Sequence, residues 1–206
     1  KLGLGLVAAG LYRSDRNDTI LPPSNGSLYG DGSTVGFYLL GVRGTHLFPH
    51  DKYRLNYNLY FYSFSSLYWG AGYDNGVNSD NESDYDRFQA QMKVDFMFRL
   101  ACNFYVGPMA VFDYVYGHDF EKPELWEGMS TRTTNLSLGL SLLYDSRDFL
   151  TNAYKGYYLR IDQRFSPAFL GNKYAFSSTE LDTRYYHEVW KGGVLAGQFH
   201  TLLNYG

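Results

Sequence analysis

The sequence predicts an all-β fold, a transmembrane antiparallel up-and-down β-barrel of which about nine strands are present. Three observations support this prediction. Apolar and polar residues alternate with a period of two along nine segments, and the connections between these segments alternate between long and short. The 206 residues include 21 Tyr and 15 Phe, a composition that favours strands with an amphipathic surface.

The segments 87–100 and 132–147 show the alternation most clearly. Successive side chains of a strand point to opposite faces, so one face of each segment is apolar and the other is polar. We expect the apolar parity to face lipid and the polar parity to face the barrel lumen. The residues expected to face lipid are Phe88, Met92, Val94, Phe96, Phe98, Leu136, Leu138, Leu140 and Leu142. Those expected to line the lumen are Arg87, Lys93, Asp95 and Arg99.

The lengths of the predicted strands suit a membrane. They lie near residues 2–14, 34–48, 53–65, 85–100, 103–117, 132–147, 156–166, 174–190 and 193–205. A strand that crosses a membrane needs about 9–11 residues, whereas strands of globular proteins have roughly 5–6. No run reaches the roughly 18 apolar residues that a membrane-spanning helix needs.

The connections give an independent indication. The long ones are predicted at 16–33, 67–84, 118–131 and 167–173, and the short ones at 48–52, 101–102, 148–155 and 190–192. Outer-membrane barrels have short turns at one end and longer loops at the other. A soluble β-sandwich with a wet outer face stays open as an alternative, although its Greek-key connections would not alternate so strictly.

Aromatic residues near the predicted strand ends fit the girdles that flank the apolar band of a barrel. The general preference of aromatic residues for strands is the competing explanation. The girdle candidates are Tyr12, Phe48, Tyr53, Tyr114, Tyr116, Tyr157, Tyr158, Trp190 and Tyr205.

Composition excludes several other classes. Cys102 is the only cysteine, so neither a disulfide framework nor a Cys-rich metal site is expected. The net charge of −3 offers no basic surface for nucleic acid. The five histidines have no metal-ligand spacing, and no nucleophile or phosphate-loop motif is present, so we expect no enzyme, cofactor or metal. The acidic residues Asp80, Glu82, Asp84 and Asp86 could hold Ca²⁺, but a solvated loop is favoured because the EF-hand glycine is missing.

The central part of the chain resembles a known family. Leu138-Gly139-Leu140-Ser141-Leu142-Leu143-Tyr144-Asp145-Ser146-Arg147-Asp148 begins the match, which continues through the segments 154–160 and 179–186. These segments resemble the barrel of the BamA/TamA-type outer-membrane assembly factors, the bacterial surface antigen family. The segment 68–75 resembles the small members of that family.

The resemblance implies a sixteen-stranded barrel in a bacterial outer membrane. It also implies a role in inserting barrel proteins, exporting polypeptides or assembling the envelope. Members carry a Val-Arg-Gly-aromatic loop that folds into the lumen, and its place would lie just after Gly206. Residues 42–44 have the letters Val-Arg-Gly, but Thr45 follows them inside a strand pattern, so they are not assigned to this loop. An odd strand count would leave an unpaired edge. We therefore expect residues 1–206 to be a partial barrel domain, with the later strands and the loop beyond residue 206.

The family segments also supply the candidate site. Charged residues of one parity on neighbouring strands can form a hydrogen-bonded network in the lumen, and a glycine just after a turn relieves crowding. The network could anchor an inserted loop, or it could be ordinary lumen filling by paired charges. The candidate residues are Gly139, Tyr144, Asp145, Arg147, Asp148, Gly156, Arg160, Asp162, Glu180, Asp182 and Arg184.

Three functional hypotheses follow. The first is envelope biogenesis of the BamA/TamA kind, with outer-membrane lipids or lipopolysaccharide as surroundings and client outer-membrane proteins or accessory subunits as partners. The second is a passive pore, because a lumen lined by charged residues would conduct ions. The third is a structural component of an outer-membrane complex.

Overall fold

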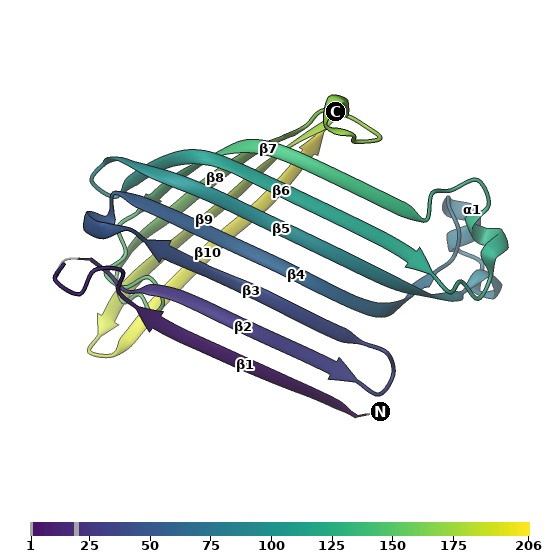
Figure 1. The fold of residues 1–206 in the computed structure, drawn as a ribbon, viewed down its shortest axis with the longest axis horizontal. Helices are drawn as coiled ribbons and strands as arrows, with labels where there is room; N and C mark the ends of the chain where they lie inside the picture. The colour runs from purple at the N-terminus through teal and green to yellow at the C-terminus, as the bar shows by residue number, and fades with distance from the viewer. Residues whose placement is uncertain (1, 19–20) are drawn as a thin grey trace.

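A computed structural model of the chain describes residues 2–18 and 21–206 and contains one antiparallel sheet of ten strands (Figure 1). Each strand pairs with its neighbours in sequence, in the order β1 to β10. The strands are β1 (Gly3–Tyr12), β2 (Ser24–Ser33), β3 (Tyr38–Leu47), β4 (Tyr53–Tyr68), β5 (Ser83–Ala101), β6 (Phe104–His118), β7 (Arg132–Asp145), β8 (Gly156–Ser166), β9 (Phe176–Trp190) and β10 (Gly193–Tyr205). The all-β up-and-down prediction is thus confirmed.

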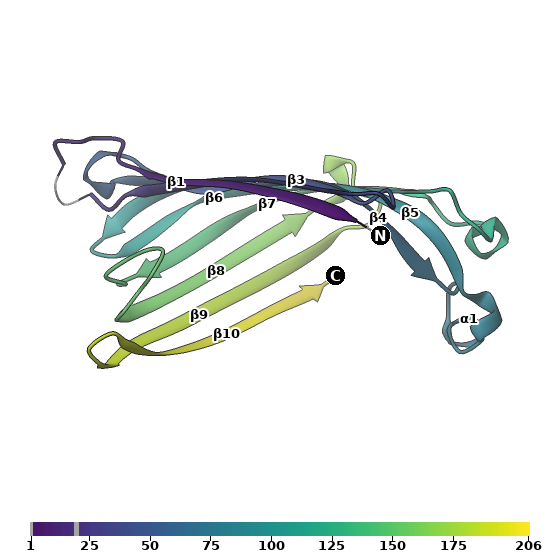
Figure 2. The same ribbon diagram turned by 90° about the horizontal axis from the view of Figure 1, so that it is seen from below.

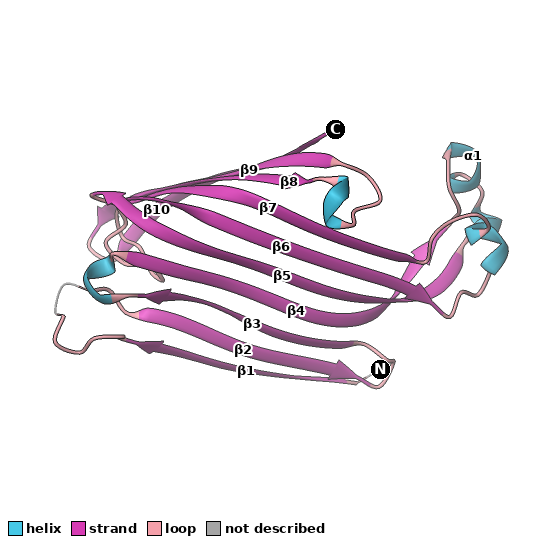
Figure 3. Cartoon of the chain, turned by 45° about the horizontal axis from the view of Figure 1, so that its top comes forward, coloured by secondary structure: helices cyan, strands magenta, loops and turns pink. Residues whose placement is uncertain are grey.

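The helical elements are short and lie at the ends of the strands (Figure 3). They are η1 (Pro49–Asp51), α1 (Tyr73–Gly76), η2 (Ser79–Asn81), η3 (Pro123–Trp126) and η4 (Ala168–Leu170). No helix in the described part of the chain is long and apolar enough to span a membrane.

The count of nine strands was wrong, because β2 lies inside the segment predicted as a long loop at 16–33. Its sequence SNGSLYGDGS contains three glycines and lacks an apolar parity, so no alternation marks it. Ladders with β1 and β3 hold it in place. Consequently the first two connections are 13–23 and 34–37. The described chain also begins and ends at the same end of the sheet rather than at opposite ends (Figure 1).

Large tyrosine rings compensate for the glycines of this region. Tyr57 on β4 covers both Gly44 and Gly26, and a Cβ at Gly44 would lie 2.5 Å from its hydroxyl. On the opposite face of the sheet, the Tyr29 ring fills the space where Gly41 would carry a side chain. Glycine therefore weakens the strand pattern of β2 and β3 while making room for aromatic rings.

The sheet curls into a trough, as Figure 2 shows, and its two faces differ in chemistry. On the concave face, charged side chains reach across intervening strands to strands that do not pair with their own. Arg54 on β4 contacts Asp145 on β7, and Lys93 on β5 contacts Glu180 on β9. The edge strands β1 and β10 do not pair with each other in the described residues.

The convex face carries the apolar parity. Met92, Phe112 and Leu136 are register partners on three successive strands, and facing residues of an antiparallel ladder share one side of the sheet. Phe98, Leu138 and Leu140 on this face are 41%, 48% and 57% exposed. All nine residues expected to face lipid lie here, and no second layer of the described chain covers them.

An aromatic row crosses one end of the convex face. The rings of Tyr12 and His46 lie 5.7 Å apart, those of His46 and Phe48 4.7 Å, and those of Phe48 and Phe96 5.7 Å. Tyr53 stacks on Phe96 at 5.7 Å. These rings come from four strands and one turn and form a continuous row.

Candidate functional site

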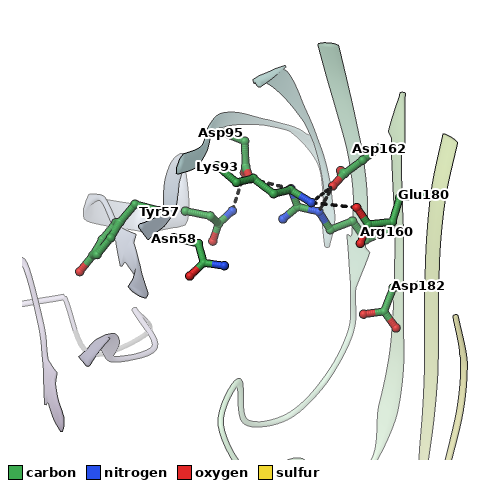
Figure 4. Close-up of a pocket in the computed structure, with 9 residues that line it drawn as sticks. Tyr57, Asn58, Lys93, Asp95, Arg160, Asp162, Glu180 and Asp182 are labelled. Atoms are coloured by element: carbon green, nitrogen blue, oxygen red, sulfur yellow. Dashed lines mark hydrogen bonds and ion pairs between the residues drawn. The ribbon is translucent and has the colours of Figure 1, made fainter. Parts of the chain in front are cut away.

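The concave face carries a charged network, here called the central cluster, formed by Lys93, Asp95, Arg160, Asp162 and Glu180. Figure 4 shows these side chains converging from β5, β8 and β9, with Tyr57 pointing away. They line a cavity of about 230 Å³. The sequence separates Asp95 from Arg160 by 65 residues, so the curl of the sheet brings them together.

Two cations bridge three carboxylates in this cluster. Lys93 Nζ lies 2.7 Å from Asp162 and 3.1 Å from Glu180. Arg160 Nη2 lies 2.5 Å from Asp95, and its Nε donates to Asp162 at 2.9 Å. The side chains of Asp95 and Asp162 are only 2% and 1% exposed. Buried charges are tolerated only when they are paired and hydrogen-bonded, so each ion depends on its partners.

Small residues on β6 and β7 let the long side chains reach across two strands. Ser141 accepts a hydrogen bond from Arg160 at 3.3 Å. Gly139 leaves no side chain on the same face, and a Cβ there would collide with the carbonyl of Gln163 on β8. Gly139 therefore permits the close approach of β7 and β8 next to the cluster.

Asp182 and Arg184 extend the network toward β10. Arg184 Nη2 lies 2.5 Å from Asp182, which also accepts from Gln198 on β10 at 2.9 Å. The guanidinium of Arg184 lies 5.1 Å from the centre of the Tyr158 ring. Tyr158 was a girdle candidate, but the structure places it on the concave face, since it shares the register level of Arg184.

A second group, here called the end cluster, consists of Asp51, Arg54, Tyr105, Asp145 and Arg147. Arg54 lies 2.7 Å from Asp51, 3.2 Å from Asp145 and 2.8 Å from the Tyr105 hydroxyl. Its guanidinium also stacks 3.9 Å from the centre of the Tyr105 ring. Arg147 binds Asp145 from the other side at 2.8 Å. The cluster joins β4, β6 and β7 at one end of the trough.

Sequence reasoning missed Asp51, Arg54 and Tyr105. Arg54 has the parity of the concave face, which was a usable signal. Asp51 lies in a turn where both it and His50 have left-handed backbones, with φ of 51° and 59°. Nothing in the sequence predicts that turn conformation, and the next residues of β6 on the face of Tyr105, Gly107 and Met109, are small or apolar.

Two predicted network residues lie outside the network. Asp148 closes the turn after β7, where its Oδ1 accepts from the backbone N–H groups of Phe149, Tyr154 and Lys155 at 3.0, 3.0 and 3.3 Å. Burial alone would raise the pKa of Asp148, but these hydrogen bonds outweigh it and lower the pKa. Tyr144 lies on the convex face beside Phe104.

The remaining candidates have local roles. Gly156 has a φ of 116°, and a Cβ there would meet the Ser146 carbonyl, so this position requires glycine. Arg87 lies near the other end of the trough, where its guanidinium is 5.5 Å from the Phe64 ring. Arg99 donates to the backbone carbonyl of His50 at 3.3 Å. Neither arginine contacts the central cluster.

A curled antiparallel sheet with an apolar convex face and a charged concave face defines the chain as an outer-membrane β-barrel protein. Residues 42–206, from within β3 to the end of β10, match the Omp85 superfamily domain, and the chain belongs to that superfamily. The predicted BamA/TamA-type family is thus confirmed at this level. No curated protein matches the chain.

The superfamily is found in the outer membranes of bacteria and organelles. Its members generally act in insertion or translocation of outer-membrane proteins, are generally not enzymes, and interact with client proteins and accessory subunits. These statements describe the family as a whole.

Proposed function

We propose that this chain forms one wall of a bacterial outer-membrane barrel that takes part in inserting or translocating outer-membrane proteins. In this proposal the convex face contacts lipid, the concave face lines the lumen, and further strands complete the barrel. Membership of the Omp85 superfamily supports the role. The observation that carries it is the central cluster. Its ion pairs connect β5 to β8 and β9, with which β5 does not pair.

The central cluster would keep the curvature of this wall fixed. Strand ladders alone allow a sheet to flex, whereas ion pairs between distant strands oppose flattening because flattening would expose unpaired buried charges. A wall of fixed shape gives client strands and accessory subunits a constant surface. Outer-membrane lipids or lipopolysaccharide would surround the convex face.

Depletion with complementation tests the proposal. Loss of the full-length protein should lower the amount of folded outer-membrane proteins, measured by the gel mobility of unheated samples. Wild-type protein should restore that amount, and Arg160→Met should restore less of it than Arg164→Met, a change on the same strand and face. A normal outer-membrane protein profile under depletion would contradict the proposal.

A passive pore is the second candidate, and one observation favours it. A cavity of about 710 Å³ opens on the concave face beside the central cluster, lined in part by Arg43, Asn58 and Arg184. Recording from the full-length protein in planar bilayers separates the two functions. A large and stable open conductance would favour the pore, and a closed or flickering record would favour the insertion role.

A further inference from the structure

A group of three metal-ligating side chains lies outside the charged network, at the end of the sheet that carries the longest connections. Asp86 on β5 and His118 on β6 are register partners, and Asp119 follows His118 directly. One ligand atom from each of the three lies within 4.8 Å of the other two. We propose that Asp86, His118 and Asp119 form a Zn²⁺ site, with one coordination position left open to an outside ligand.

The donor set indicates the metal. It offers one imidazole nitrogen and two carboxylate oxygens, and the His118 Nδ1 lies 2.8 Å from Asp119 Oδ2. Zn²⁺ binds histidine and carboxylates together, whereas Ca²⁺ and Mg²⁺ prefer ligand sets made only of oxygen. Three protein ligands leave a fourth tetrahedral position for water or an anionic group.

Two of the three ligands are held in position before any metal binds. Asp86 accepts a hydrogen bond from the Ser65 hydroxyl on β4 at 2.9 Å, and the His118 ring packs 5.3 Å from the Tyr116 ring. Outer contacts of this kind orient ligands and strengthen metal binding. Asp119 is the adaptable ligand, because its side chain is 78% exposed.

No cation of the chain competes for these carboxylates. Within residues 2–18 and 21–206, neither Asp86 nor Asp119 forms an ion pair with lysine or arginine. In the central cluster, by contrast, lysine and arginine occupy the carboxylates. The two carboxylates beside His118 therefore remain available to a bound cation.

The position of the site indicates which kind of group would occupy the open coordination position of the metal. Asp86 and His118 continue the convex parity of Phe88 and Tyr116, so the site lies at the rim just beyond the apolar face. An anionic group at that level, such as a phosphate, could fill the open position of the metal. The sequence did not indicate the site, because Asp86 lies far from His118 along the chain and only the β5–β6 register joins them.

Zinc titration of the folded full-length protein in detergent tests the proposal. Calorimetry with zinc chloride, in millimolar magnesium, should show one site per chain that His118→Ala weakens at least about tenfold, since even second-shell changes cost roughly 10–100-fold in metal affinity. His187→Ala is the matched control, because His187 stacks on Tyr185 on the same convex face. It should bind zinc as the wild type does.

Circular dichroism and gel mobility show whether His118→Ala folds. If it does not fold, Asp119→Asn is the variant to test. It changes a largely exposed side chain, and it should also weaken binding. Unchanged zinc affinity in a folded His118→Ala or Asp119→Asn variant would overturn the site, as would displacement of zinc by magnesium at comparable concentration.

Discussion

Replacing Arg160 by methionine tests whether the central cluster holds together strands that do not pair. The guanidinium contacts Asp95 at 2.5 Å and Asp162 at 2.9 Å, and both carboxylates are almost fully buried. Removing one partner of a buried ion pair costs about 3–5 kcal/mol, because a charge is left uncompensated. Asp162 keeps Lys93 at 2.7 Å, and Asp95 keeps the Asn56 amide at 2.6 Å. We therefore expect a loss of about 3 kcal/mol in the free energy of unfolding.

Urea unfolding of the full-length protein in lipid vesicles measures this loss, with tryptophan fluorescence and gel mobility as readouts. Arg164→Met is the matched control on the same face of β8. In the described chain its ion pair is a long one, 3.6 Å to Glu180, which Lys93 and His200 also contact. The control should lose clearly less than Arg160→Met, because Glu180 keeps Lys93 and His200 as partners. If Arg160→Met loses no more than the control, the buried ion pairs of Arg160 do not hold the sheet together.

Three further predictions concern the two faces and one turn. Leu140→Arg on the convex face should cost about 2–4 kcal/mol in lipid vesicles if that face contacts the bilayer midplane, whereas Asn58→Arg on the concave face should cost far less by the same urea assay. Asp148 should stabilise the fold fully above about pH 4, the ordinary pKa of an aspartate, and progressively less as the pH falls from there through its lower folded-state pKa. The difference in unfolding free energy between wild type and Asp148→Asn should accordingly shrink between pH 7 and pH 3. Gly139→Ala should reduce the folded fraction on unheated gels, because its Cβ meets backbone, while Gly10→Ala, with nothing within 4 Å, should not.

Much of the fold could be predicted from the sequence, because a period of two fixes both the strands and the face of each residue. The prediction failed where side chains carry no such signal. The strand β2 is glycine-rich, and it is a strand because its backbone pairs with β1 and β3.

The candidate site was predictable only in part. Parity places Arg160 and Asp162 on the charged face, yet it cannot say that Lys93 reaches Asp162 across two strands. That contact depends on how strongly the sheet curls and on the small residues between. Asp145 and Arg147 of the end cluster were predicted, but its other three members were missed for a similar reason, since Asp51 reaches Arg54 and Tyr105 through a left-handed turn.

The buried apolar cluster of this sheet is too small to fix its curvature, as a hydrophobic core does in a soluble protein. In the described chain the apolar cluster contains only Met97, Tyr105 and Leu143, with Tyr158 packed against it. The large apolar side chains lie on the convex face, which no other layer of the described chain covers. The hydrophobic effect therefore fixes which face turns outward but gives the sheet little reason to adopt one curvature. Ion pairs that span β4 to β9 supply that constraint, because only one curvature satisfies all of them at once.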